Sequence, residues 1–190
     1  VVQSLKANIA LLKKRFSLVE DELDAEIESA VNVEFRRQLK KVYKSYFQIH
    51  TVLADDQFNQ ARNEVEKMKN AVNIPDMKLL SHQNHTRWMQ MAEELKKILS
   101  GAAKAGKIEK LRQEFALLSE QIFVLATELG IPPESTYYQL KCPMAFNNRG
   151  ATWVQEYKET QNPYFGSAMF KCGSVIEIIE PGIADTDTGE

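Results

Sequence analysis

The chain has 190 residues and a formal net charge of −2, which favours one domain, with or without an appendage, and leaves room for a hydrophobic core. The balanced charge and the lack of a basic stripe argue against nucleic acid as a partner, and no run of about 18 apolar residues could span a membrane. The chain begins with Val1 rather than Met, which we interpret as a fragment or a processed product.

The first 30 residues are predicted to form an N-terminal helix or linker. Apolar residues recur every three or four positions from Val2 to Val19, as in an amphipathic helix. The stretch that follows, EDELDAEIESA, is acidic and has few large apolar side chains, which is typical of a linker or of a solvated continuation of the helix.

Four further helices are predicted between residues 31 and 133. Asp55 and Asp56 are expected to form a turn and cap one helix, Ser81 is expected to cap the next, and Gly130 to end the last. Short connections favour an antiparallel bundle of four to five helices. The apolar spacing places the helices at about 33–53, 58–72, 82–100 and 108–129. The predicted core consists of Phe35, Leu39, Tyr46, Trp88, Leu95, Phe115 and Ile122.

The pattern changes after Pro133. Gly, Pro and Asn become frequent and helical spacing fades, except around residues 152–158, so an irregular lobe packed on the bundle is expected over 134–176. The segment VIEIIE is predicted to be a short strand or an extended tail, and residues 177–190 a flexible tail. The expected fold class is therefore all-α, with an appended lobe.

The predicted lobe contains both cysteines of the chain, each with a methionine close by. Cys142 and Met144 are two positions apart, and Met169 and Cys172 are three positions apart. Thiolates and thioethers are soft donors that select Cu(I) or Ag(I), whereas methionine is a poor ligand for Zn(II). Three other interpretations remain open: methionines that fill gaps in the core, cysteines buried as small hydrophobic residues, or one structural disulfide.

A further candidate ligand lies in the segment SHQNHTRWMQM. Helical spacing places His85, Trp88 and Met89 on one face, where an imidazole, an indole and a thioether together suit a soft cation. Alternatively, Trp88 and Met91 belong to the core and His82 faces solvent. We add His85 to the candidate metal ligands.

No catalytic motif is recognisable in the sequence. A Gly-rich phosphate loop, a GxSxG elbow and an HExxH helix are all lacking. The spacing gives no support to Cys142 and His85 acting as a nucleophile and its base. We therefore expect a binding protein rather than an enzyme.

Two long motifs, CPMAFNNRGATWVQ and NPYFGSAMFKCG, resemble a C-terminal domain of periplasmic membrane-fusion adaptor subunits in copper/silver RND efflux systems. The same domain, formally of unknown function, also occurs as a small stand-alone secreted protein. The resemblance extends upstream through FRRQLKKVYKSYFQIHTVLADDQFNQA and HTRWMQMAEELKKI and covers about residues 33–175. It implies a periplasmic location, partners among the efflux adaptor and RND pump components, and a role in copper or silver export.

The resemblance assigns the metal role to Cys142, Met144, Met169 and Cys172, with His85 as a fifth residue. It predicts a domain that binds or senses Cu(I) or Ag(I) beside an efflux adaptor and passes the ion on by ligand exchange. The alternative is a disulfide-stapled helical interaction module that holds no metal. Both predict that the two cysteines lie close together, because the loop between them has turn residues at both ends.

Overall fold

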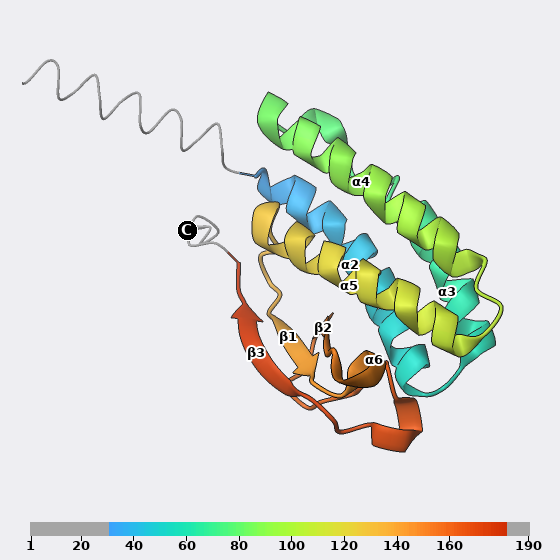
Figure 1. The fold of residues 1–190 in the computed structure, drawn as a ribbon. Helices are drawn as coiled ribbons and strands as arrows, with labels where there is room; N and C mark the ends of the chain where they lie inside the picture. Colours follow the sequence, from blue (N-terminus) through green and yellow to red (C-terminus); the bar gives the residue numbers. More distant parts are fainter. Residues whose placement is uncertain (1–30, 182–190) are drawn as a thin grey trace, which may run out of the picture.

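The computed structural model describes residues 31–181 of the chain. The helix predicted over residues 2–19 and the linker after it lie outside the described residues. In the described part, four long helices run alternately up and down as an antiparallel bundle, and a small antiparallel sheet packs beside it (Figure 1). None of the helices in this range combines the length and the apolar character needed to cross a membrane.

All four helices predicted between residues 31 and 133 are confirmed. They are α2 (Val33–Ala54), α3 (Phe58–Ala71), α4 (His82–Ala103) and α5 (Ile108–Glu128). The Ser81 side chain accepts a hydrogen bond from the Asn84 backbone N–H at 3.5 Å and caps α4, as predicted. Gly130, which follows α5, adopts φ +82°. This conformation has little energetic cost for glycine, because glycine has no Cβ.

The predicted cap at Asp55 and Asp56 is wrong. Both residues lie in the turn between α2 and α3, but the residue that precedes α3 is Gln57, which makes no capping hydrogen bond with its side chain. Asp56 itself has φ +59° and hydrogen-bonds to Arg112 and Ser167, which are distant in the sequence. A long-range charged partner has replaced the local capping interaction.

The predicted core is confirmed, since none of its seven residues has more than 2% of its surface exposed. These residues belong to one cluster with Leu140, Trp153 and Val154 from the sheet. The bundle and the sheet therefore share a single hydrophobic core.

Residues after Pro133 form a three-stranded antiparallel sheet, so the all-α prediction is wrong for this part of the chain. The strands are β1 (Tyr137–Cys142), β2 (Ala151–Gln155) and β3 (Ser174–Ile179), in the order β2-β1-β3. The expected strand in VIEIIE is confirmed as β3, which crosses the predicted boundary between the lobe and the tail at residue 176. A four-residue helix, α6 (Ala145–Asn148), and a 3-10 turn, η2 (Gly166–Met169), connect the strands.

The helical spacing around residues 152–158 was misleading, because residues 151–155 form β2. Strand β2 packs against α5 and pairs with β1 along its whole length. A run of five residues with a buried side is too short for periodicity to separate helix from strand.

One buried tyrosine links the bundle to the sheet. The Tyr46 hydroxyl of α2 accepts a hydrogen bond from the Val154 backbone N–H of β2 at 3.0 Å and lies 2.8 Å from the Ser119 Oγ of α5. A backbone donor in the core is thus satisfied by a side chain of the bundle, which fixes where β2 lies on the helices.

A candidate dithiol site at the end of the sheet

The two cysteines meet at one end of the sheet. Cys142 is the last residue of β1, and Cys172 lies two residues before β3, where Lys141 pairs with Ser174. Their Sγ atoms are 3.2 Å apart, which confirms that the two residues are close in space. Both are free thiols, because the distance is well beyond the ~2.05 Å of a disulfide bond.

The two thiols differ in access to solvent. Cys142 is fully buried, and Cys172 is half-buried. The hydrogen bond with Cys142, together with burial and the electrostatic interaction between the two sulfur groups, raises the pKa of the Cys172 thiol above its usual value. Cys172 is therefore protonated at neutral pH, and any metal that binds it must displace a proton.

The backbone around Cys172 is held in place on both sides. Its N–H donates to the Met169 carbonyl at 2.9 Å, and its carbonyl accepts from Asn162 Nδ2 at 2.7 Å. Gly173 follows with φ +133°, and a Cβ there would come within 2.6 Å of the Trp153 ring. Only glycine lets the chain pass over Trp153 and carry Cys172 to its partner.

The two predicted methionines flank the thiols along the chain. Met144 lies in the turn after β1 with 45% of its surface exposed. Met169 is half-buried at the end of η2. Both thioethers belong to segments next to a cysteine in the sequence. Met144 is the more exposed of the two.

The structure does not bring His85 to the cysteines. His85 lies in the first turn of α4, near the end of α5, as the 3.3 Å ion pair between Arg87 and Glu128 shows. Strand β1, which ends at Cys142, runs away from the first turn of α4 and towards α6 (Figure 1). The predicted shared face around His85 does not form either, because Trp88 is buried and Met89 is exposed.

No larger cluster of metal ligands is found in residues 31–181. Nowhere in this range do three or more His, Cys, Asp or Glu side chains come together in a way that could hold an ion. In the described part of the chain, the candidate donors beyond the two thiols are therefore the methionine thioethers.

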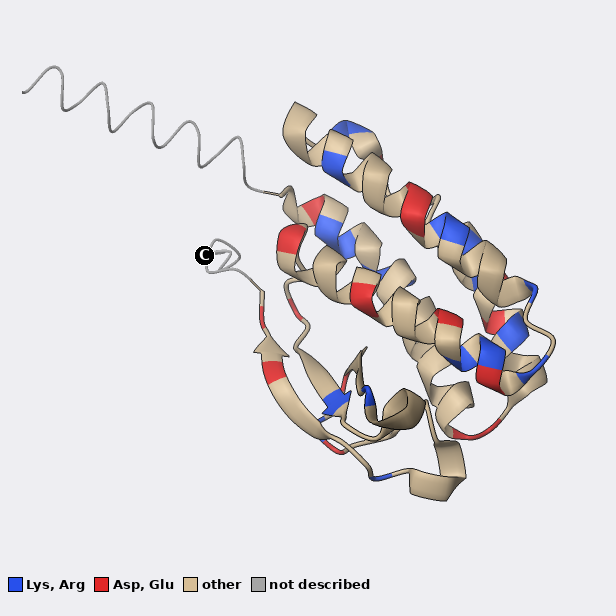
Figure 2. Ribbon diagram, viewed as in Figure 1, with Lys and Arg blue, Asp and Glu red and all other residues tan. Residues whose placement is uncertain are grey.

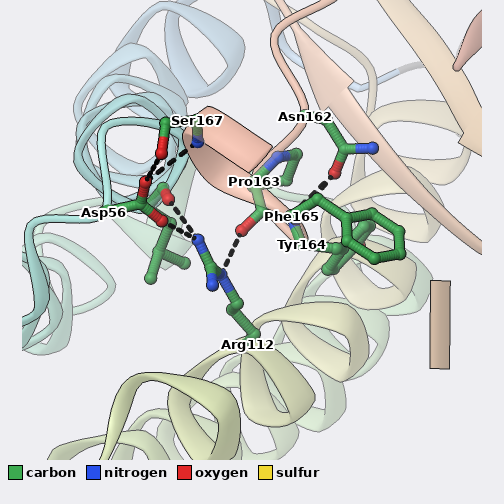
Figure 3. A network of polar contacts seen from close by, with 8 residues as sticks. Asp56, Arg112, Asn162, Pro163, Tyr164, Phe165 and Ser167 are labelled. Carbon is green, nitrogen blue, oxygen red and sulfur yellow. Dashed lines mark hydrogen bonds and ion pairs between the residues drawn. The ribbon is translucent and has the colours of Figure 1, made fainter. Parts of the chain in front are cut away.

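A polar network that sequence reasoning missed fixes the loop leading to Cys172 (Figure 3). Arg112 donates from Nη2 to Asp56 Oδ1 at 2.7 Å and to the Leu53 carbonyl at 3.0 Å, and from Nε to the Pro163 carbonyl at 2.8 Å. Ser167 donates to Asp56 Oδ2 from its N–H at 2.9 Å and from its hydroxyl at 2.6 Å. These hydrogen bonds from Ser167, followed by that from Arg112, lower the pKa of Asp56 to about 2.

The NPYFG segment, residues 162–166, forms a turn that Asn162 organises. Its Oδ1 accepts from the backbone N–H groups of Tyr164 at 2.8 Å and Phe165 at 3.2 Å (Figure 3). Gly166 closes the turn with φ +59°, and a Cβ there would lie 2.0 Å from the Asp56 carboxylate. The contact between Ser167, which follows this turn, and Asp56, 111 positions away, left no local signal in the sequence.

His50 is a second residue that the sequence did not single out. It is buried on α2, and its Nε2 donates to the Gln161 carbonyl at 2.8 Å, just before the NPYFG turn. Burial lowers the pKa of His50 to about 4, against the opposing effect of this hydrogen bond. At neutral pH the ring is therefore uncharged and acts as an anchor for the loop.

Residues 42–133 match the model of a family described as a protein of unknown function (DUF3347). The match begins within α2 and ends before β1, so neither cysteine lies in the matched range. No curated protein and no solved structure shows significant similarity to the chain.

Proposed function

We propose that the protein binds one Cu(I) or Ag(I) ion through Cys142 and Cys172 and passes it on by ligand exchange, beside an efflux adaptor in the bacterial periplasm. The observation that carries the metal-binding proposal is the 3.2 Å separation of the two Sγ atoms. The compartment and the efflux partner rest on the sequence resemblance alone.

The donor set suits a soft monovalent ion better than zinc. Two thiolates match Cu(I) or Ag(I), whereas a structural Zn(II) site takes four nitrogen or sulfur ligands. With metal–sulfur bonds of about 2.3 Å, the sulfurs have to move from 3.2 Å to roughly 4.6 Å apart for a near-linear site, a separation of roughly 1.4 Å. Cys172 is the thiol able to move, since it is half-buried while Cys142 is enclosed by the core.

Ligand exchange follows from this difference in access. An ion held by a donor group of a carrier meets the Cys172 sulfur first, and one carrier bond breaks as the Cys172 bond forms and its proton leaves. Cys142 then replaces a second carrier ligand and releases its own proton. The oxidation state of the metal does not change, and the reverse sequence releases the ion.

A second candidate function is a disulfide-stapled interaction module without metal. Two thiols in contact at the ends of neighbouring strands are suited to oxidation, in which two protons and two electrons pass to a disulfide of an oxidising compartment, and that disulfide is reduced to two thiols. The oxidised pair offers no thiolate. In this state the protein has only its thioethers as soft donors.

The test is a competition titration of the reduced full chain against a chromogenic Cu(I) chelator, without oxygen. We expect one Cu(I) per chain, much tighter than Zn(II), with binding lost in Cys142→Ser combined with Cys172→Ser. Affinity should fall in Met144→Leu combined with Met169→Leu. His85→Gln serves as the matched control, and its affinity should be unchanged because His85 is remote from the dithiol.

Two outcomes would count against the metal site. Unchanged Cu(I) affinity in the double cysteine variant would exclude these sulfurs as ligands. No Cu(I) binding in either redox state would favour the interaction module, and a thiol count on the purified protein would show whether the cysteines are bridged.

A further inference from the structure

A basic hollow lies between α2 and α3. Its volume is about 450 Å³, and the residues that line it are distant in the sequence from the two cysteines. Lys41 and Lys44 of α2 line one side, Lys67 and Ala71 of α3 line the other, and Ile74 lies beyond the end of α3. The hollow thus combines positively charged side chains with an apolar floor.

The lysines of the hollow carry more charge than their surroundings neutralise. The α2 helix is basic over its first half (Figure 2). Lys67 forms an ion pair with Glu64 at 2.7 Å, whereas neither Lys41 nor Lys44 forms one within residues 31–181. Lys44 does lie close enough to Glu156 to oppose the rise in the pKa of that carboxyl. Three lysines therefore face one carboxylate in the hollow itself.

Ile74 makes the hollow suitable for a polypeptide rather than for a simple anion. It is 43% exposed, next to the buried Ala71. In a peptide, an apolar side chain that stands between acidic residues would cover Ile74 while the neighbouring carboxylates reach the lysines. An inorganic anion has no apolar group and cannot cover Ile74.

The chain itself contains a segment with this composition. Residues 20–28 read EDELDAEIE, with six acidic residues, no basic ones, and Leu23 and Ile27 four positions apart. We propose that residues 20–28 dock in the hollow of the same chain, with their carboxylates against Lys41, Lys44 and Lys67 and an apolar side chain against Ile74.

The length of the connection permits this. The described structure begins at Val31, three residues after Glu28. Three extended residues span at most about 10 Å. Lys41 lies eight residues into α2, about 12 Å along its axis at ~1.5 Å per residue. Because an extended chain spans up to ~3.3–3.6 Å per residue, residues 20–28 are tethered closely enough to Val33 to reach Lys41 and Lys44. Docking would cover Ile74 and set the direction in which the chain approaches α2.

The test is zero-length carbodiimide cross-linking of the full chain, with the linked peptides mapped by mass spectrometry. This reagent joins a carboxylate to a lysine amine only where the two are in contact. We expect links within one chain from residues 20–28 to Lys41, Lys44 or Lys67. A mixture of ¹⁵N-labelled and unlabelled protein distinguishes links within a chain from links between chains. The yield should fall about tenfold in ~1 M NaCl, where screening extends over only ~3 Å.

Matched variants separate docking from chance contact. Lys41→Glu combined with Lys44→Glu removes two of the three reactive amines and reverses their charge, so the informative yield is that of links to Lys67. This yield should fall about tenfold, because the attraction of two exposed ion pairs is lost. Adding Asp21→Lys and Glu22→Lys to that variant should restore links between the same two stretches. The control, Lys96→Glu combined with Lys104→Glu on the distant α4 and its end, makes the same charge change and should leave the yield unchanged.

Three results would overturn the proposal. One is links to Lys96 and Lys104 as frequent as links to the hollow, and another is no link from residues 20–28 at all. The third is links formed only between labelled and unlabelled chains, which would place the segment on a second copy.

Discussion

Arg112 on α5 and Asp56 in the α2–α3 turn form an ion pair, with Nη2 and Oδ1 2.7 Å apart. The arginine side chain is 11% exposed and the aspartate side chain 38%. Because Ser167 binds the same carboxylate, the pair joins two parts of the bundle to the loop that carries Cys172 (Figure 3). The geometry of the dithiol therefore depends on a contact far from the sulfur atoms.

Replacing the buried guanidinium should be strongly destabilising. Arg112→Met leaves the carbonyls of Leu53 and Pro163 and the Asp56 carboxylate without this donor, so we expect a loss of about 2–4 kcal/mol in the free energy of unfolding. Urea denaturation at pH 7 measures it. The control Arg62→Met removes an exposed 3.4 Å hydrogen bond to the Ala103 carbonyl and a 5.9 Å contact over the Phe58 ring, and should cost less than about 1 kcal/mol. Equal losses in the two variants would contradict a special role for Arg112.

The Asp56 interactions should be lost in acid. The folded-state pKa of about 2 lies below the usual 3.8, so this stabilisation is complete above pH 4 and disappears as the pH falls from about 4 to about 2. We expect the stability difference between the natural protein and Asp56→Asn to shrink over this range, in urea unfolding series at several pH values. Asp55→Asn, which removes the adjacent carboxylate, is the control. A difference that stays constant down to pH 2 would rule out the ion pair as its source.

Burial of His50 should make the fold sensitive to mildly acidic pH. Its pKa is 6.5 in an unfolded chain and about 4 when folded, so the unfolded state takes up the proton first and stability falls as the pH drops from about 6.5 to about 4. A shift of this size corresponds to about 3 kcal/mol. His50→Gln retains a donor for the Gln161 carbonyl and should lose this pH dependence. His82→Gln on exposed surface should keep it, and a His50→Gln profile parallel to the natural one would contradict the prediction.

Oxidation of the dithiol should stabilise the protein. A disulfide between Cys142 and Cys172 closes a loop of 30 positions, which restricts the unfolded chain and contributes about 3–4 kcal/mol. Urea unfolding of oxidised and reduced protein measures the difference. The double variant Cys142→Ser with Cys172→Ser should show no difference in unfolding free energy between oxidising and reducing conditions. Oxidised protein no more stable than reduced protein would mean that bridging distorts the sheet.

The hydroxyl of Tyr46 should matter more than its partner Ser119. Tyr46→Phe leaves the buried Val154 N–H without an acceptor, at a cost of about 1–3 kcal/mol. Ser119→Ala leaves that acceptor in place and should cost less. Amide hydrogen exchange at Val154 should accelerate in Tyr46→Phe and stay slow in Ser119→Ala. Slow exchange in both would show that the tyrosine does not hold β2.

The helices could be predicted because their determinants are local. Apolar residues three or four apart define each buried face, and Ser81 and Gly130 mark ends through interactions within a few residues. The same spacing identified the seven core residues, because a helix face that is apolar over several turns has to be covered by its neighbours.

The sheet and the site required the tertiary structure. Strand β1 pairs with β2 along one edge and with β3 along the other. Its register with β3 shifts between Gln139 and Leu140, and no local sequence pattern encodes this shift. The sequence by itself determined the cysteines as candidate donors and the turns that let them approach. Only the folded chain decided that Cys142 is buried, that Cys172 is half-exposed and that His85 lies elsewhere. Such relations depend on how the sheet packs on the bundle, where residues more than a hundred positions apart, such as Asp56 and Ser167, become neighbours.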